Sequence, residues 1–130
     1  MIEFYEKSNI KNYVFEFEKN ILKLLISSDL ALTRCGANTT AELTHTLTPF
    51  IAVPIPHSVG NHQYLNAKYY ENKGCCWILE QNDFNSENLF SLIVEAIKNK
   101  QKLENIKENM KKNKSKDVYK DIENVIKEFI

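Results

Sequence analysis

Three short apolar runs alternate with longer segments of helical pattern along the chain. The runs cover residues 30–33, 50–53 and 75–79. Uninterrupted apolar runs of this length are typical of strands that are buried on both faces of a parallel sheet. Between them, residues 39–47 have the length of a short helix and residues 62–73 that of a longer one. The pattern therefore predicts strand–helix units with parallel strands.

Further elements flank this central part. Residues 13–17 form a short β-prone run, and residues 19–28 place Ile and Leu side chains on a broad helical face. Gly74 follows the helix at 62–73, where a left-handed residue commonly ends a helix. Three more helical segments are predicted, at residues 86–99, 101–112 and 116–129.

These elements predict an α/β protein with a partial Rossmann-like, three-layer fold, built on a short parallel sheet of three or four strands. We expect residues 1–130 to form a single truncated domain, with residues 9–80 as the α/β core and residues 86–130 as C-terminal helices. With so few strands, the chain looks like the second half of a doubly wound sheet. The cut edge of such a sheet is exposed, so we expect a partner, self-association or poor solubility.

The composition is that of an ordinary globular domain. Of 130 residues, 43% are hydrophobic and 26% are charged, and the formal net charge is zero. This balance argues against nucleic acid as a partner. Lysines concentrate between residues 98 and 120, and we interpret them as a solvated helical face in preference to an anionic-membrane patch. Because the apolar runs are far shorter than a membrane span and no basic–apolar leader is present, we expect a cytoplasmic protein; contact with the inner face of the plasma membrane stays open.

The cysteines indicate neither a disulfide nor a metal. Cys35, Cys75 and Cys76 lack C-x-x-C spacing, and together with the three histidines they match no known zinc-ligand pattern. We expect reduced, partly buried thiols, no metal and no cofactor. Cys35 has no paired histidine with an orienting acid, so it is not predicted to be a nucleophile.

The first loop that follows a predicted strand contains Arg34, Cys35, Gly36, Ala37 and Asn38. Gly36 is expected to let the backbone turn tightly and to let a ligand approach it. The first amides of the following helix have no partner within the helix, and with the helix dipole they attract anions such as a diphosphate. Every strand-to-helix loop of this fold class shares these properties, so the loop alone predicts no more than anion binding.

Glu42 has two interpretations. Thr39, Thr40, Ala41 and Glu42 fit a capping box, in which Thr39 caps the helix and Glu42 reaches back to the Thr39 amide. In the alternative, the Glu42 carboxylate accepts hydrogen bonds from a vicinal diol, such as the hydroxyls of a ribose. The residues alone favour the cap.

The second loop leaves its strand through Pro54 and Pro56, which stiffen the exit and end strand pairing. Asn61 suits the N-cap of the next helix. His62 and Gln63 then lie in the first turn, where they offer donors and acceptors to sugar hydroxyls or are simply solvated. His57 is either part of this surface or a buried histidine bonded to the backbone.

Taken together, the two loops resemble the C-terminal domain of the bacterial peptidoglycan N-acetylglucosaminyltransferases, in glycosyltransferase family 28. The resemblance rests on RCGANTTAEL, PFIAVPIPH and NHQYLNA at their mutual spacing and covers the chain from about Asn9 onward. It implies the C-terminal domain of a GT-B fold. It also implies the donor UDP-GlcNAc, from which these enzymes move GlcNAc onto a lipid-linked muramoyl-pentapeptide with inversion.

The resemblance assigns roles to individual residues. Glu42 contacts the ribose of UDP, which reverses the preference for a cap, and Ala37 with the adjoining helix start faces the diphosphate. His62, where the family often has Gln, and Gln63 hold the GlcNAc hydroxyls. The segment Phe17 and Glu18 matches the one whose backbone recognises uracil, with an acidic residue in place of the usual apolar one. The expected donor site further includes Gly36, Arg34, Asn38, Thr39, His57 and Asn66.

The chain departs from the family in what it lacks. Missing are the acceptor-binding N-terminal domain, with the expected general base, and the Gly-Gly-Ser loop that grips the donor phosphates. We therefore expect the UDP-GlcNAc-binding part of an inverting transferase, with no catalytic residue of its own and no activity alone. It would work with a separately encoded N-terminal domain and touch the membrane only through the full enzyme. The alternatives are a stand-alone nucleotide-sugar-binding module and a non-catalytic remnant.

Overall fold

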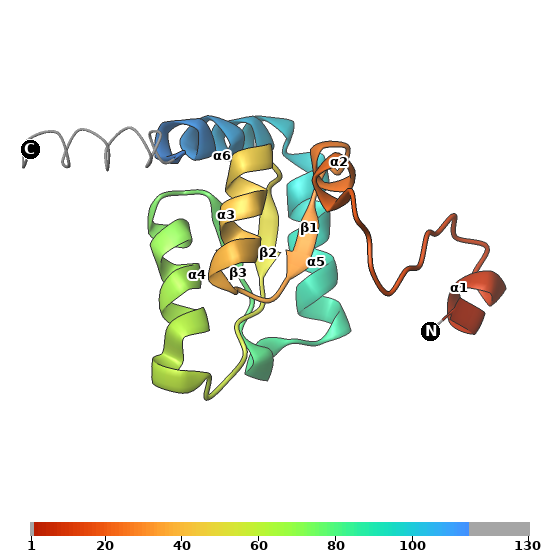
Figure 1. Ribbon diagram of the computed structural model, residues 1–130. Helices are drawn as coiled ribbons and strands as arrows, with labels where there is room; N and C mark the ends of the chain where they lie inside the picture. The colour runs from red at the N-terminus through yellow and green to blue at the C-terminus, as the bar shows by residue number, and fades with distance from the viewer. Residues whose placement is uncertain (1, 115–130) are drawn as a thin grey trace, which may run out of the picture.

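A computed structural model describes residues 2–114 of the chain (Figure 1). The predicted helix at residues 116–129 lies outside the described residues. The elements, in chain order, are α1 (Ile2–Lys7), α2 (Ile21–Ile26), β1 (Ala31–Thr33), α3 (Ala37–Thr46), β2 (Phe50–Ala52), η1 (Val59–Asn61), α4 (His62–Asn72), β3 (Cys76–Ile78), η2 (Gln81–Asp83), α5 (Ser86–Lys98) and α6 (Lys100–Asn113).

The three strands form one parallel sheet in the order β1-β2-β3. Ile51 is the centre of the register, opposite Leu32 on one side and Trp77 on the other. All three residues of β2 are completely buried, because neighbouring strands flank β2 and helices cover it. The prediction of a parallel α/β sheet is confirmed.

Helices cover both faces of this sheet. Figure 1 shows α3 and α4 in front of the strands, α5 behind them, and α6 across the end where the strands begin. Both β1–β2 and β2–β3 crossovers carry their helix on the same face, as right-handed connections require. The core contains Leu43 of α3, Ala67 of α4 and Met110 of α6, all at most 1% exposed. This arrangement confirms the three-layer prediction.

Buried threonines tie the layers together. The Thr48 hydroxyl donates to the Leu25 carbonyl at 2.8 Å, which joins the segment before β2 to the end of α2. The Thr44 hydroxyl donates to the Thr40 carbonyl at 2.8 Å within α3. Each of these threonines is at most 5% exposed, and each hydroxyl is satisfied, so its burial leaves no unpaired donor.

The strand predicted at residues 13–17 is wrong. The segment between α1 and α2 contains no strand, and Tyr13 and Phe17 are 68% and 79% exposed. A strand needs a neighbouring strand to pair its backbone groups, and the described residues place none beside this segment. The packed layers therefore begin at α2, which is shorter than the helix predicted at 19–28.

The sequence predicted that all three apolar runs form strands buried on both faces. For β1 this prediction is wrong. Leu32, at the centre of β1, is 49% exposed. β1 lies at an edge of the sheet, so one side of the strand has no neighbour among residues 2–114.

Gly74 ends the turn after α4 in the left-handed region, at φ +67°, as the sequence predicted. A Cβ at this position would lie 2.6 Å from Nδ2 of Asn109, and that amide donates to the Gly74 carbonyl at 3.1 Å. The glycine is therefore required both by backbone conformation and by the close approach of α6.

We expect Gly74→Ala to lower the free energy of unfolding by about 1–3 kcal/mol, because it adds backbone strain and displaces Asn109. Urea unfolding followed by circular dichroism measures this loss. Gly36→Ala is the matched control: Gly36 has φ −64°, and a Cβ there would meet nothing closer than Thr39 Oγ1 at 3.9 Å. Its cost should not exceed about 1 kcal/mol. Equal losses in the two variants would contradict the assignment.

Candidate functional site

The two loops singled out in the sequence lie at the same edge of the sheet. Parallel strands all end at one edge, and there the chain passes from β1 into α3 and from β2 into α4. The N-termini of both helices are consequently at the carboxyl ends of the strands, where ligands bind in open α/β sheets (Figure 1).

Side chains of α4 hold the first loop in place. The Gln63 side-chain carbonyl Oε1 accepts from the backbone amides of Cys35, at 3.4 Å, and of Ile55, at 3.0 Å. Asn66 Nδ2 donates to the Cys35 carbonyl and to the Thr40 hydroxyl, both at 2.9 Å. Gln63 and Asn66, two of the residues expected in the site, thus join both loops into one unit. The side-chain nitrogen of Gln63, Nε2, makes no hydrogen bond among the described residues.

The start of α3 has the features of an anion-binding site. Gly36 is the N-cap and makes no side-chain cap, and the first backbone bond of the helix runs from the Thr40 amide to the Gly36 carbonyl at 3.0 Å. The preceding amides, on Ala37 to Thr39, have no partner within the helix. Gly36 lies in the ordinary extended region, so the prediction that it makes a tight turn is wrong. Its lack of a side chain keeps the backbone open to a ligand.

The capping box at Glu42 is also wrong. α3 begins at Ala37, two residues before the predicted cap, so Thr39 lies inside its first turn and Glu42 inside its second. The Glu42 side chain makes no hydrogen bond within residues 2–114, and the residue is exposed. The earlier helix start separates Glu42 from the N-cap, which leaves its carboxylate available on the surface of the helix.

The second loop has an unusual backbone. His57, Gly60 and Asn61 have φ between 56° and 58°, a region that non-glycine residues rarely occupy. Asn61 is the N-cap of α4, as predicted, but its side chain makes no cap; the Ser58 hydroxyl instead accepts from the Gln63 amide at 3.3 Å. Non-glycine residues keep such a strained backbone only where surrounding contacts hold it, and they are concentrated at ligand sites.

His62 is exposed at the start of α4, and its ring packs beside Gly60. A Cβ on Gly60 would lie 3.1 Å from His62 Nε2. The glycine thus lets the imidazole fold over the η1 turn, beside the first turn of α4 that carries Gln63.

Arg34 connects three strand ends. Its Nη1 atom donates to the Val53 carbonyl at 3.2 Å and to Gln81 Oε1 at 2.7 Å. The Arg34 charge is therefore held at the edge of the sheet between the β2 and β3 loops. Sequence reasoning missed Gln81; its signal is a polar residue two positions after the strand predicted at residues 75–79.

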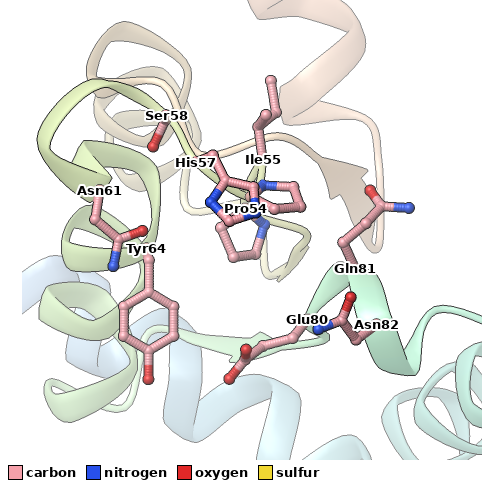
Figure 2. Close-up of a pocket in the computed structure, with 10 residues that line it drawn as sticks. Pro54, Ile55, His57, Ser58, Asn61, Tyr64, Glu80, Gln81 and Asn82 are labelled. Carbon is pink, nitrogen blue, oxygen red and sulfur yellow. The ribbon is translucent and has the colours of Figure 1, made fainter.

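A pocket of about 540 Å³ lies between the loops that follow β2 and β3 (Figure 2). Of the residues expected in the site, only His57 lines it; Pro54 of the second loop lies beside His57 in Figure 2. Tyr64 and Glu80 contribute polar groups that the sequence did not single out. The full lining is Pro54, Ile55, Pro56, His57, Ser58, Asn61, Tyr64, Glu80, Gln81 and Asn82.

Phe17 and Glu18 are not brought to the two loops. They lie in the segment between α1 and α2, which extends away from the packed layers (Figure 1). The Glu18 carboxylate accepts from the Asn20 amide at 2.8 Å and from the Tyr13 hydroxyl at 3.3 Å. The uracil contact assigned to these residues stays a prediction.

The three cysteines are buried free thiols. Burial raises the pKa of the Cys35 thiol from its ordinary value of 9.0 to about 11, against the opposing effect of the Arg34 charge. Burial likewise raises the pKa of the Cys76 thiol. Since the thiolate is the nucleophile, Cys35 is unsuited to covalent chemistry. Within residues 2–114 no cluster of His, Cys, Asp or Glu could hold a metal ion.

The raised pKa values predict how stability depends on pH. The folded chain holds the Cys35 proton more tightly than the unfolded chain does. The resulting contribution to the free energy of unfolding is intact below pH 9 and is lost as the pH rises toward 11. We expect the free energy of unfolding, measured in urea, to fall over this range, and to fall less in Cys35→Ala. Identical pH profiles for the two proteins would contradict the assignment. Ellman's reagent at neutral pH should label Cys35 only after unfolding.

Comparisons with known proteins place this chain in a family. The Glycosyltransferase family 28 C-terminal domain matches residues 1–122, and the chain belongs to this family. The fold is shared with the crystal structure of Acinetobacter baumannii MurG, with a TM-score of 0.78 and 25% sequence identity over 89% of this chain and 33% of that chain.

Two similar relatives are each named as the UDP-N-acetylglucosamine–N-acetylmuramyl-(pentapeptide) pyrophosphoryl-undecaprenol N-acetylglucosamine transferase. The one from Pelagibacter ubique is 37% identical over 75% of this chain and 28% of its own length. The one from Rickettsia bellii is 41% identical over 78% of this chain and 28% of its own length. The chain thus spans less than a third of the curated relatives it matches. Among the described residues, no helix combines the length and the apolar character needed to cross a membrane.

Proposed function

We propose that this chain is the UDP-GlcNAc-binding part of an inverting N-acetylglucosaminyltransferase that makes the lipid-linked peptidoglycan precursor. The observation that carries the proposal is the joining of the two family loops by Gln63 and Asn66, which holds the N-terminus of α3 beside that of α4. A donor with a diphosphate and a hydroxylated sugar has complementary groups for such a pair of helix starts.

Each part of the donor has a counterpart in this proposal. The free amides of Ala37 to Thr39 and the backbone at Gly36 take the diphosphate, and the exposed Glu42 carboxylate takes the ribose hydroxyls. His62 and Gln63 take the GlcNAc hydroxyls; the side-chain Nε2 of Gln63 has no hydrogen-bond partner among the described residues and can donate to them. Arg34, Asn38, His57 and Asn66 support this surface. No metal is needed, because the helix N-terminus supplies the positive field.

The chemistry of transfer assigns a limited role to these residues. In an inverting transfer, the acceptor oxygen bonds to the anomeric carbon of GlcNAc from the side opposite UDP. As this bond forms, the bond from that carbon to the β-phosphate oxygen breaks, and UDP departs with the electron pair. Helix amides that bind the diphosphate stabilise the charge that develops on UDP. The base that takes the acceptor proton would come from an acceptor-binding domain, on the cytoplasmic face of the membrane, so the chain alone should bind donor without transferring it.

We expect Glu42→Ala to weaken UDP binding at least tenfold, because two charge-assisted hydrogen bonds to the ribose are lost. NMR titration with UDP measures this effect even at the weak affinity expected of a partial site. His45→Ala, one turn further along the same exposed side of α3, is the matched control and should bind UDP normally. Unchanged UDP affinity in Glu42→Ala would rule out the ribose contact.

Gln63→Glu tests the sugar contact separately. The carboxylate keeps the acceptor for the Cys35 and Ile55 amides but removes the amide donor, so the fold should persist. We expect the preference for UDP-GlcNAc over UDP, measured by parallel titrations, to fall about tenfold. The added negative charge repels UDP, with its terminal phosphate, more than UDP-GlcNAc, so charge alone would raise this ratio. A retained or increased preference would therefore contradict the assignment.

A chain that binds UDP-GlcNAc but transfers nothing even when an acceptor-binding domain is added would favour the stand-alone binding module. Absence of any UDP-induced shift in the NMR spectrum would favour a non-catalytic remnant.

A further inference from the structure

The pocket of about 540 Å³ between the loops after β2 and β3 is lined mostly by residues without a role in the donor site (Figure 2). Of the residues assigned to the donor, only His57 lines it. Its other polar side chains include Asn61, Tyr64, Glu80 and Asn82, and none of these four makes a side-chain hydrogen bond or ion pair among the described residues. A cavity of this size with several unused polar groups is typical of a ligand site.

The pocket lies beyond the sugar site, on the side away from the diphosphate. The strands follow the order β1-β2-β3, so the start of α3, the start of α4 and this pocket succeed one another along the edge of the sheet. The sugar site and the pocket share a wall, because the Ile55 amide donates to Gln63 Oε1 at 3.0 Å and Ile55 also lines the pocket. In an inverting displacement the incoming oxygen approaches the face of the sugar opposite the leaving group. The pocket is therefore on the acceptor's side of the donor.

The charges around the pocket do not suit a phosphate. Glu80 is the carboxylate among its lining residues, and none of them is a lysine or an arginine. An adjoining cavity of about 170 Å³ shares Tyr64 and Glu80 with the pocket and adds Lys68, Glu71 and Asp83. Lys68 is ion-paired with Glu71 at 2.5 Å, so Glu80 and Asp83 leave this end of the pocket negative. A cationic group is attracted there, and a pyrophosphate is repelled.

The rest of the lining matches a peptide. Ile55 and two prolines give apolar surface. The side-chain amides of Asn61 and Asn82 carry both donors and acceptors, which are the groups that peptide amides require. The Tyr64 hydroxyl and the Glu80 carboxylate lie at one end of the pocket in Figure 2, where both also line the adjoining cavity. A peptide that lies along the pocket thus meets a carboxylate at this end.

We propose that this pocket binds the peptide of the acceptor, with an amine of that peptide at the Glu80 carboxylate. The acceptor named for the Pelagibacter ubique relative carries a pentapeptide. The inference rests on the proposed function, because it takes the neighbouring site to be that of the donor. It assigns to this chain a contact with the acceptor, and leaves the sugar and the lipid of the acceptor to the acceptor-binding domain.

The test is an NMR titration of the isotopically labelled chain with two probes. One is an N-acetylmuramoyl-pentapeptide that contains one lysine, and the other is the same compound acetylated on the lysine amine. We expect the amine probe to shift the backbone signals of Asn61, Tyr64 and Glu80 and to bind about fivefold more tightly than the acetylated probe, as for an exposed ion pair. Neither probe contains uridine or a diphosphate, so saturation with UDP should not block binding.

Glu80→Gln is the discriminating variant, because it removes the charge and keeps the shape of the side chain. It should erase the preference for the amine probe and leave UDP affinity unchanged, which also shows that the fold is intact. Glu104→Gln is the matched control. It removes a carboxylate that pairs with Lys107 on α6, at the opposite end of the sheet, and it should keep the preference (Figure 1).

Three results would overturn the inference while the proposed function stands. In the first, UDP shifts the signals of α3 but neither probe shifts a pocket residue at about 5 mM. In the second, Glu80→Gln keeps the preference for the amine. In the third, UDP displaces the peptide, which would place the peptide in the donor site. Binding of the amine probe without any binding of UDP would instead support the peptide pocket and overturn the donor site, and failure of both ligands to bind would overturn both proposals.

Discussion

Complete burial of β2 constrains the rest of this structure. Phe50, Ile51 and Ala52 have no exposed surface, and a strand in that position must satisfy its backbone groups through neighbours on both sides. Both ladders are parallel, so the chain has to return over the sheet through a helix before each new strand. All strand-to-helix loops are then gathered at one edge. The candidate site is a consequence of this constraint, because the constraint brings together segments that lie 28 and 31 residues apart at their joining hydrogen bonds.

The side chains that shape the site also hold the fold together. Gln63 accepts from amides of both loops, and Asn66 binds the first loop and α3 with one amide group. Such contacts fix the positions of two helix N-termini before any ligand arrives, which reduces the ordering that binding requires. His57 and Asn61, which have left-handed backbone conformations, lie in the same loop. There the Ser58 hydroxyl accepts a hydrogen bond from the backbone amide of Gln63 at the start of α4. Pre-organisation of this kind suits a donor that is bound by backbone amides more than by charged side chains.

Several predictions from the sequence failed for identifiable reasons. The capping box at Thr39 and Glu42 has the right residue spacing, yet α3 begins at Ala37, since Gly36 is the N-cap and its carbonyl accepts the first helical hydrogen bond. Residues 13–17 have the composition of a strand, but strand formation requires a neighbour that the described residues lack. Gln81 and Tyr64 were missed because their roles depend on elements that are distant in the chain.

By itself, the sequence determined the local properties of this protein: three strands, the helices between them, the left-handed glycine at Gly74 and the two loop motifs of the family. These follow from periodicity, backbone preference and short-range spacing, which act within a few residues. Only the tertiary structure decided that Gln63 joins the two loops, that Arg34 reaches Gln81, and that one side of Leu32 is left without a partner. Those features depend on which strands are neighbours, and neighbours are chosen by packing of the whole sheet and not by local sequence.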